Sequence, residues 1–353
     1  MDIKKLLESR KEEIDAKISE FIPKKLDKSS LEKICGKPRY AYDAETASKA
    51  VNEPIWDLLS RGGKRWRPVL FLLANEAFGG DSKKVMDFVV IPEVVHNGTL
   101  MVDDCEDFSE LRRGKPCIHK IYGIDVAINA GNAMYYLPLL SLMKNRDVFP
   151  KETMLKAYEI YSQEMINLSY GQGMDIWWHK GNKYDVSEDE YLQMCAYKTG
   201  TLARMSAKLG ALFAGANEKQ LEAIGKFAES IGVAFQIQDD ILNLVGEEFG
   251  KGKGAGEDIH EGKRTLMVIH SLSKSDKKDA ARLREILLAH PSEQKVIDEA
   301  IAIIQKYNSI SYAAGRAKEI VSVAWKELEP LLKPSKAKDS LKSFADYLIE
   351  REI

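Results

Sequence analysis

Prolines are distributed unevenly along this chain, and their distribution constrains the fold more than any other feature of the sequence. Eleven prolines are present, yet none lies between Pro150 and Pro291. Because proline breaks the interior of an α-helix, this proline-free interval can contain long helices. Apolar residues recur within it at intervals of three and four, for example at Leu221, Ile224, Phe227, Ala228 and Ile231. Such spacing predicts amphipathic helices.

Signals for β-strands are scarce in the same sequence. Alternating runs rich in β-branched residues are hard to find, and no Asn-Gly or Asp-Gly pair joins two such runs. The single Asn-Gly pair, Asn97-Gly98, interrupts an otherwise helical pattern. We therefore predict an all-α protein.

The predicted helices follow one another closely. We expect them over residues 4–21, 44–60, 65–78, 83–107, 125–144, 151–174, 187–216, 218–246, 263–272, 276–289, 293–329 in two pieces, and 336–350. Pro92 and Pro138 fall inside two of them and should kink the helix or bound a turn. The segment 231–245 is apolar nearly all round, which is typical of a helix at the centre of a bundle.

No linker, repeat or low-complexity tract divides the chain. The glycine-rich and charged stretch 246–263, GEEFGKGKGAGEDIHEGK, is a connector between helices. At 353 residues the length allows two domains, but we predict a single domain over 1–353.

Composition limits the function classes. Apolar residues make up 44% of the chain and charged residues 30%, while the formal net charge is only −2. No whole-protein field therefore favours nucleic acid or an anionic membrane. The N-terminus lacks the apolar core of a signal peptide, and no stretch reaches about 18 uninterrupted apolar residues. We expect a cytoplasmic protein with no transmembrane segment.

The four cysteines do not indicate a metal centre. They form no CxxC pair and have no zinc-like spacing with the six histidines. We interpret them as reduced thiols.

An acid cluster ends one apolar segment, in LMVDDCEDFSELRRGKP at 100–116. On a helix, Asp103 and Asp107 are one turn apart with Asp104 beside them, so their Cβ atoms are about 5–6 Å apart. Like charges at this spacing repel unless a cation lies between them, and carboxylate oxygens suit Mg²⁺. A solvated acidic helix end is the alternative interpretation.

A second group repeats the spacing. Asp239, Asp240 and Asn243 lie on the apolar helix of 231–245, and Gln236 continues the polar stripe one turn earlier. Aspartates in an apolar helix are costly without partners. Two acid groups that face each other across a bundle could hold several Mg²⁺ ions, and an anionic ligand would complete the assembly.

Cationic residues occur beside glycine turns in distant segments. They are Lys64, Arg65 and Arg67 in RGGKRWRP, Arg112 and Arg113, Lys198 with Thr199 in YKTG, and Lys253 and Lys263. Any single one of them is more often an ordinary surface residue, but together they are what diphosphate binding requires. His96 precedes Asp103 by about 10 Å along the helix axis, which fits a second anion site.

Taken together, these motifs resemble those of the trans-isoprenyl diphosphate synthases, the polyprenyl synthetase family. The resemblance covers about residues 50–330, with GGKRWRP, EVVHNGTLMVDDCEDFSELRRGKP, GQGMD, KTG, FQIQDDILN and GKGKGAGEDIHEGKRT in family order. It implies a helical bundle of the isoprenoid synthase type around a deep central cavity, usually as a homodimer. It also implies a Mg²⁺-dependent prenyltransferase that joins isopentenyl diphosphate head-to-tail to allylic diphosphates. Residues 1–43 precede the resemblance as a helical extension.

The resemblance also implies roles for individual residues. Ligands of about three Mg²⁺ ions would be Asp103, Asp104, Asp107, Asp239 and Asp240. Direct cationic partners of the allylic diphosphate would be Arg112, Lys198, Lys253 and Lys263, and the isopentenyl diphosphate site would be Lys64, Arg67, His96 and Arg113. Thr199 and Gln236 would face the developing allylic cation. Asn243 departs from the family's fuller pattern, which has a third aspartate there.

The resemblance also implies that product length depends on the residues one turn before the first acid cluster, past which the growing chain extends in this family. Gly98 and Thr99 are small, which predicts a product of C20 or longer, and Tyr135 or Tyr136 is the candidate floor of the cavity. We expect geranylgeranyl diphosphate. The alternatives are a farnesyl or a longer C25–C30 polyprenyl diphosphate synthase, a class I terpene cyclase, and a regulatory synthase subunit.

Overall fold

The structure is a computed structural model that describes residues 2–245 and 256–349. Two compact units contain these residues, each with its own core. Unit 1 comprises Met1–Glu159 with Ser206–Ala216, and unit 2 comprises Ile160–Met205 with Asn217–Ile353. The single-domain organisation expected from the sequence stays a prediction.

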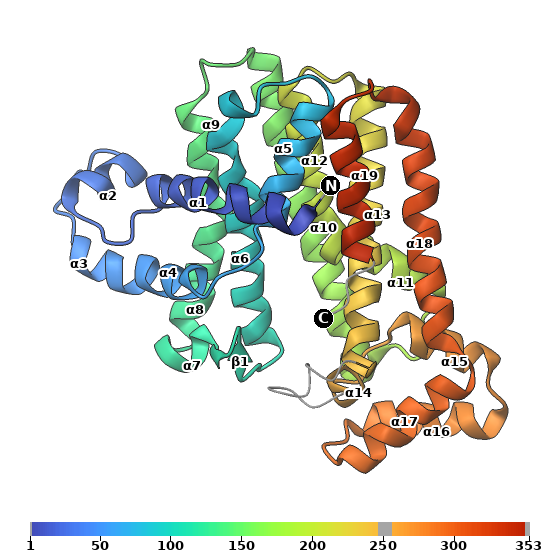
Figure 1. The fold of residues 1–353 in the computed structure, drawn as a ribbon. Helices are drawn as coiled ribbons and strands as arrows, with labels where there is room; N and C mark the ends of the chain where they lie inside the picture. Colours follow the sequence, from blue (N-terminus) through green and yellow to red (C-terminus); the bar gives the residue numbers. More distant parts are fainter. Residues whose placement is uncertain (1, 246–255, 350–353) are drawn as a thin grey trace. The chain divides into compact units, whose positions relative to one another are not determined.

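Unit 1 is helical except for one short hairpin (Figure 1). Its elements are α1 (Ile3–Phe21), α2 (Lys28–Cys35), α3 (Ala44–Ala47), η1 (Ser48–Asn52), α4 (Glu53–Ser60), α5 (Trp66–Ala77), η2 (Ser82–Val89), α6 (Val90–Glu106), β1 (Leu111–Arg112), β2 (Lys115–Pro116), α7 (Ile118–Tyr122), α8 (Ile124–Tyr136), η3 (Leu137–Leu139) and α9 (Leu140–Lys144). The unit boundaries fall within α10 (Lys151–Trp177) and α12 (Thr201–Phe213).

Aromatic stacking forms part of the core of unit 1. Phe88 and Phe213 stack with ring centroids 4.2 Å apart, and Phe149 lies 4.8 Å from Phe213. Gly210 brings the end of α12 against α5, since a Cβ at this position would lie 2.1 Å from the carbonyl oxygen of Phe71. A glycine is therefore needed for this approach of two helix backbones.

The segment that carries the first acid cluster is a core helix. Ser82–Glu106 is long and apolar enough to cross a bilayer. Within its most apolar stretch of 18 residues, however, 72% is buried inside the protein. This burial favours a core helix over a membrane span. Pro92 lies in the first turn of α6, where its missing N–H breaks no helical hydrogen bond. Asn97 stays helical because its side chain donates to the carbonyl and carboxylate oxygens of Glu93.

Two glycines allow α6 and α8 to pack closely (Figure 1). A Cβ on Gly98 would lie 2.8 Å from the Cβ of Met134 and 2.9 Å from the carbonyl oxygen of Gly131. A Cβ on Gly131 would in turn lie 2.7 Å from a methyl group of Val102. The small residue at position 98 therefore has a packing role in unit 1.

Unit 2 is built around the long helix α13, which lies beside α18 and α19 (Figure 1). Its elements after α10 are η4 (Trp178–Asn182), α11 (Glu188–Cys195), η5 (Ala196–Gly200), α13 (Glu218–Val245), α14 (Glu257–His260), α15 (Leu266–Lys274), α16 (Lys277–Ala289), α17 (Gln294–Lys306), α18 (Ser309–Leu328), η7 (Glu329–Leu331) and α19 (Lys336–Ile349). Phe227 of α13 packs on Trp325 of α18 with ring centroids 5.2 Å apart.

The all-α prediction is confirmed, with local differences. The predicted helices 44–60, 83–107, 125–144 and 187–216 are each interrupted by a 3₁₀ or π segment, and Pro138 lies in one of these, η3. The sequence analysis missed α2, α7, α14 and the hairpin of β1 and β2. The hairpin turn places Arg113 and Gly114 at φ 54° and 73°, and its strands of two residues are too short for an alternating pattern.

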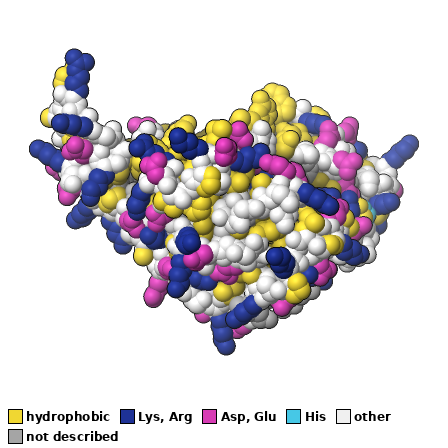
Figure 2. All heavy atoms as spheres, turned by 90° about the horizontal axis from the view of Figure 1, so that it is seen from above, with side chains coloured by type: hydrophobic (Ala, Val, Ile, Leu, Met, Phe, Trp, Pro, Cys, Tyr) yellow, Lys and Arg dark blue, Asp and Glu magenta, His cyan; other side chains and the backbone are white. Residues whose placement is uncertain are grey.

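Surface charges of both signs are mixed. Figure 2 shows one face of the molecule, on which Lys and Arg side chains lie among Asp and Glu side chains. This distribution agrees with the formal net charge of −2.

We predict that Gly210→Ala destabilises the protein. The new methyl group meets the backbone of α5 rather than a flexible side chain, and overpacking of this kind costs about 1–3 kcal/mol. The matched control is Gly315→Ala on α18, where a Cβ meets nothing within 4 Å. Thermal unfolding of both variants checks the prediction, and equal melting temperatures would contradict it.

Candidate active site

The first acid cluster ends α6 in unit 1, and its three aspartates differ in environment. The Asp104 carboxylate is 1% exposed and accepts a hydrogen bond of 2.8 Å from Nε of Arg112. Asp103 is half-buried, 3.7 Å from the same guanidinium, and Asp107 is the C-cap residue of the helix. Asp104 therefore forms a buried pair with Arg112. Asp103 and Asp107 are only partly buried at the end of the helix.

Arg112 is held firmly in its charged form. Burial opposes the charge, but the hydrogen bond to Asp104 and the fields of Asp104 and Asp103 outweigh burial and raise the pKa of Arg112. The pKa of the adjacent Arg113 shifts in the opposite direction. Burial and the positive charges of Arg65, Arg112 and Arg61 lower it, and the opposing field of Glu93 is not large enough to compensate.

Several arginines act on His96, which lies nearly two turns before the first aspartate on the same helix. Burial lowers the pKa of His96 well below its usual value, and the positive fields of Arg67, Arg113, Arg112 and Arg65 act in the same direction. The imidazole is therefore neutral at pH 7 and can donate a hydrogen bond without adding charge. Guanidinium groups beside a neutral donor are typical of sites that bind multiply charged anions.

The first turn of α5 and the loop before it carry the other basic residues of the predicted set. Arg67 is buried, and its guanidinium lies 4.2 Å from the ring centroid of Trp66, a cation–π contact that supports the side chain. Lys64 is exposed. Arg67 and Arg113 of the predicted set thus lie close enough to His96 for their positive fields to act on it. The inclusion of Lys64, and the binding of isopentenyl diphosphate by this set, stay predictions.

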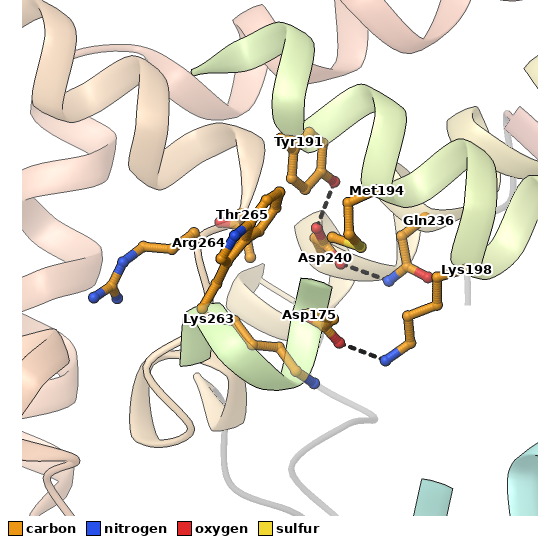
Figure 3. Close-up of a pocket in the computed structure, with 10 residues that line it drawn as sticks. Asp175, Tyr191, Met194, Lys198, Gln236, Asp240, Lys263, Arg264 and Thr265 are labelled. Atoms are coloured by element: carbon orange, nitrogen blue, oxygen red, sulfur yellow. Dashed lines mark hydrogen bonds and ion pairs between the residues drawn. The ribbon is translucent and has the colours of Figure 1, made fainter. Parts of the chain in front are cut away.

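Asp240 of the second acid cluster lines a cavity of about 40 Å³ within unit 2, together with Gln236 of the same helix (Figure 3). Asp240 accepts hydrogen bonds from the Tyr191 hydroxyl at 2.7 Å and from the Gln236 amide at 2.8 Å. Lys198 donates to Asp175 at 2.5 Å. Arg264 also lines the cavity, but its guanidinium points away from these carboxylates and donates to the carbonyl of Gly262.

Two glycines allow the π-helical turn η5 to reach this cavity. A Cβ on Gly171 would lie 2.3 Å from the backbone nitrogen of Lys198, and one on Gly232 would lie 2.5 Å from Cα of Gly200. The turn is therefore in close contact with α10 and α13. It carries Thr199, whose hydroxyl donates to the Gln236 side-chain oxygen at 2.8 Å.

Carboxylates outnumber ammonium groups in this part of unit 2. Burial and the field of Asp258 raise the pKa of Asp240 to about 8, and burial also raises the pKa of Asp258. Lys263 ion-pairs with Asp258 at 3.3 Å and with Glu261 at 2.6 Å. For Asp175, burial favours the neutral form, but Lys198 and Lys263 outweigh it and lower the pKa.

Asn243 has a structural role in the second motif. Its side-chain oxygen accepts a hydrogen bond of 3.1 Å from the backbone N–H of Asp258, and its carbonyl accepts from Gly256 at 2.8 Å. The residue thus anchors the start of α14 to α13. Its neutral amide adds no charge to a region that already contains buried carboxylates.

The donor groups fit a hard divalent cation, which prefers carboxylate oxygens. Within the described residues, the Asp104 oxygen Oδ2 is buried without a hydrogen-bond partner. Burial and, after it, the field of Asp258 raise the pKa of Asp240, and a nearby divalent cation would oppose both effects. No group of three His, Cys, Asp or Glu side chains among the described residues is close enough to hold a metal by itself. The number of metal ions therefore stays a prediction, and anionic oxygens of a ligand would have to complete their coordination.

The residues predicted to set product length differ in exposure. Tyr135 is half-buried beside α6, where burial and the fields of Glu106 and Asp103 raise its pKa. Its Cε1 atom would lie 3.2 Å from a Cβ on Gly98. Tyr136 is 70% exposed, so Tyr135 is the better candidate for a cavity floor. Thr99 is half-buried.

Several functional side chains were missed by the sequence analysis. Asp175 lies in the GQGMD motif, which was noted without a role for its aspartate, and Asp258 lies in the connector after the second cluster. Tyr191 has no sequence signal, because it reaches Asp240 from a distant helix. Lys253 lies outside the described residues. The expectation that the two acid clusters face each other stays a prediction.

Carboxylate clusters together with neighbouring arginine and lysine side chains are typical of the class of protein that binds diphosphates with divalent cations. Residues 48–304 match the Polyprenyl synthetase family. The short chain isoprenyl diphosphate synthase of Methanothermobacter thermautotrophicus is 35% identical over 321 residues, which cover 88% of this chain and 96% of the relative. The geranylgeranyl diphosphate synthase of Sulfolobus acidocaldarius is 35% identical over 305 residues, 85% and 90% of the two chains.

A solved structure is similar over nearly its full length. The geranylgeranyl pyrophosphate synthetase of Pyrococcus horikoshii has a TM-score of 0.86 and 33% identity, with 99% of each chain covered. This chain therefore belongs to the polyprenyl synthetase family, has the isoprenoid synthase fold and is a trans-prenyltransferase. Members of the family use divalent metal ions with diphosphate substrates.

The buried Asp240 generates a prediction about pH. Its proton is retained up to about pH 8 in the folded protein, whereas an ordinary aspartate loses it near its usual pKa of 3.8. The folded state thus binds more protons between these values. The stability contributed by this group is complete below pH 3.8 and is lost as the pH rises through about 8.

We expect the Asp240→Asn variant, in EDTA and without ligands, to unfold above the wild-type temperature at about pH 9, by about 2 °C or more. The difference should shrink toward about pH 5, where both side chains are neutral. Thermal unfolding between about pH 5 and pH 9 measures the difference in melting temperature. The control is Asp298→Asn, which changes an exposed aspartate. A difference that does not change with pH would contradict the assignment.

Proposed function

We propose that this enzyme condenses isopentenyl diphosphate with allylic diphosphates to form geranylgeranyl diphosphate. The observation that best supports this condensation is the arrangement along α6. His96, on which several arginines act, lies before the aspartates at the end of the helix. One helix thus presents a site for a bare diphosphate and a site for a metal-bound diphosphate. Two diphosphate substrates need both sites, whereas a class I terpene cyclase needs only the second.

In this proposal Lys64, Arg67, His96 and Arg113 bind isopentenyl diphosphate. The expectation from the sequence that Arg112 in unit 1, and Lys198 and Lys263 in unit 2, are partners of the allylic diphosphate is retained for each unit by itself. Bound Mg²⁺ supplies charge neutralisation of the diphosphate as its bond to the allylic carbon breaks. The double bond of isopentenyl diphosphate then attacks this carbon, and the departing diphosphate accepts the proton that is lost.

Thr199 and Gln236 support the cationic stage of the reaction. The Thr199 hydroxyl proton is committed to Gln236, so the lone pairs of its oxygen are available to a neighbouring positive charge. The Gln236 amide is itself fixed by Asp240. A fixed dipole needs no reorganisation when the charge develops.

Assembly as a homodimer is part of the proposal. Several apolar side chains on α7, α8 and the segment after them are exposed in the single chain, namely Ile121, Ile124, Ile128, Tyr136, Met143 and Val148. A second copy that covers them would remove apolar surface from water. We further propose a cytoplasmic location, which rests on the sequence alone.

Loss of Asp239 tests the metal assignment. We expect Asp239→Asn to lower kcat/KM by about 100-fold or more at saturating Mg²⁺, because a neutral amide is a weaker ligand than a carboxylate. The control is Glu218→Gln, which neutralises an exposed carboxylate on the same helix. Release of pyrophosphate from labelled substrates by the homomeric protein measures both. Activity close to wild type in Asp239→Asn would refute the assignment, and no release by the wild-type chain would favour a regulatory subunit.

The C20 length is supported by the relatives named geranylgeranyl diphosphate synthases and by the half-buried Tyr135. Gly98 adds less support, since its small size also serves the contact with α8. The smaller side chain of Tyr135→Ala should lengthen the product, whereas Tyr136→Ala should not. Incubation with labelled isopentenyl and farnesyl diphosphates, followed by sizing of the dephosphorylated products, measures the lengths. A dominant C15 or C30 product from wild type would refute C20, and unchanged lengths in Tyr135→Ala would exclude it as the floor.

A further inference from the structure

The N-terminal helix α1 lies outside the family match at 48–304, yet it contacts the loop that carries Lys64 and Arg67. This contact passes through Arg65, the residue between them in GGKRWRP. Asp15, near the middle of α1, accepts a hydrogen bond of 2.8 Å from Nε of Arg65. A segment with no assigned role thus reaches the proposed isopentenyl diphosphate site.

Arg65 is anchored on several sides. Its guanidinium donates to the Glu93 carboxylate at 2.7 Å, to the Leu59 carbonyl at 3.1 Å and to the Gly62 carbonyl at 3.4 Å. The side chain is 3% exposed, and Glu93 is 4% exposed. A guanidinium buried to this degree needs its donors satisfied, because an unsatisfied buried donor is costly.

The backbone of Arg65 explains why the anchoring matters for the loop. Its φ of 51° lies in the left-handed region, which is unfavourable for a residue with a side chain. Arg65 is also the N-cap residue of α5, so its conformation sets where the helix begins and where Arg67 projects. Tertiary contacts must hold this strained conformation in place.

Asp15 and Glu93 both stabilise the charged form of Arg65. Burial disfavours the charge on Arg65, but the fields of Glu93 and Asp15 outweigh burial and raise its pKa. Glu93 is fixed on α6 by a second hydrogen bond, from the Asn97 amide at 2.9 Å. Asp15 supplies the attachment on the opposite side, from α1, and closes a triad of Asp15, Arg65 and Glu93.

We propose that Asp15 is a positioning residue for isopentenyl diphosphate: through Arg65 it holds the loop of residues 62–67 in its binding conformation. This inference rests on the proposed function of that loop. It gives the N-terminal extension an indirect role in substrate binding, although the family match does not include it.

The test separates positioning from simple stabilisation of α1. We expect Asp15→Asn to raise the KM for isopentenyl diphosphate by about 5-fold to 10-fold, with kcat and the KM for the allylic substrate changed less than about twofold. Asp15→Glu should recover most of the loss. The matched control is Arg10→Gln, which removes another ion pair between α1 and α5, the 3.1 Å pair of Arg10 with Glu76. It should leave all three constants unchanged.

A second measurement does not depend on turnover. Inorganic pyrophosphate, added without metal, should raise the melting temperature of the wild type and of Arg10→Gln by the same amount, and that of Asp15→Asn by less than half as much. Equal losses in both variants, or equal changes in both KM values, would overturn the positioning role. If the wild type shows no prenyl transfer, the proposed function fails, while the pyrophosphate shifts still decide whether Asp15 positions the loop.

Discussion

Buried pairs of arginine and carboxylate are the interaction on which the proposed site in unit 1 depends. Glu93 and Asp104, at opposite ends of α6, are both almost fully buried, and each accepts a hydrogen bond from an arginine of a neighbouring segment. A buried charge without its partner is strongly destabilising, so these pairs also fix the segments that contribute the arginines. The hairpin and the loop before α5 are placed in this way, and with them the exposed or half-buried groups that remain for ligands.

In unit 2, hydrogen bonds and close contacts at glycines fix the segments that carry the polar residues of the cavity. The chain of Thr199, Gln236, Asp240 and Tyr191 connects η5, α13 and α11 through three successive hydrogen bonds. Gly171 and Gly232 allow the backbone of η5 to approach two helices. A further ion network of Arg204 with Glu164 and Glu229 ties the start of α12 to α10 and α13. The polar residues of the cavity are thereby held by several elements at once.

Much of this could be predicted from the sequence, because the relevant signals are local. Helix positions follow from the spacing of apolar residues, and Asp103, Asp107, Arg67 and Asp239 lie in motifs whose chemistry is visible in a few neighbouring letters. Side chains that act across long separations leave no such signal. Asp15 is 50 residues from Arg65, and its neighbours on α1 are an ordinary mixture of charges. Gly98 shows another limit, since a small residue is required equally by a cavity and by a close helix contact.

Asn243 has a consequence for how chains of this family are told apart. Loss of an acidic residue from the second motif can be taken as a sign that a chain has lost catalysis and acts only as a subunit. Here the asparagine accepts a hydrogen bond from a backbone amide and secures α14, in a region where another carboxylate would add to existing repulsion. Asn243 thus has a role that does not require an acidic side chain, and a criterion based only on the number of acidic residues in the motif would misclassify this chain. The hydrogen bond that the side chain at position 243 makes is more informative than its charge.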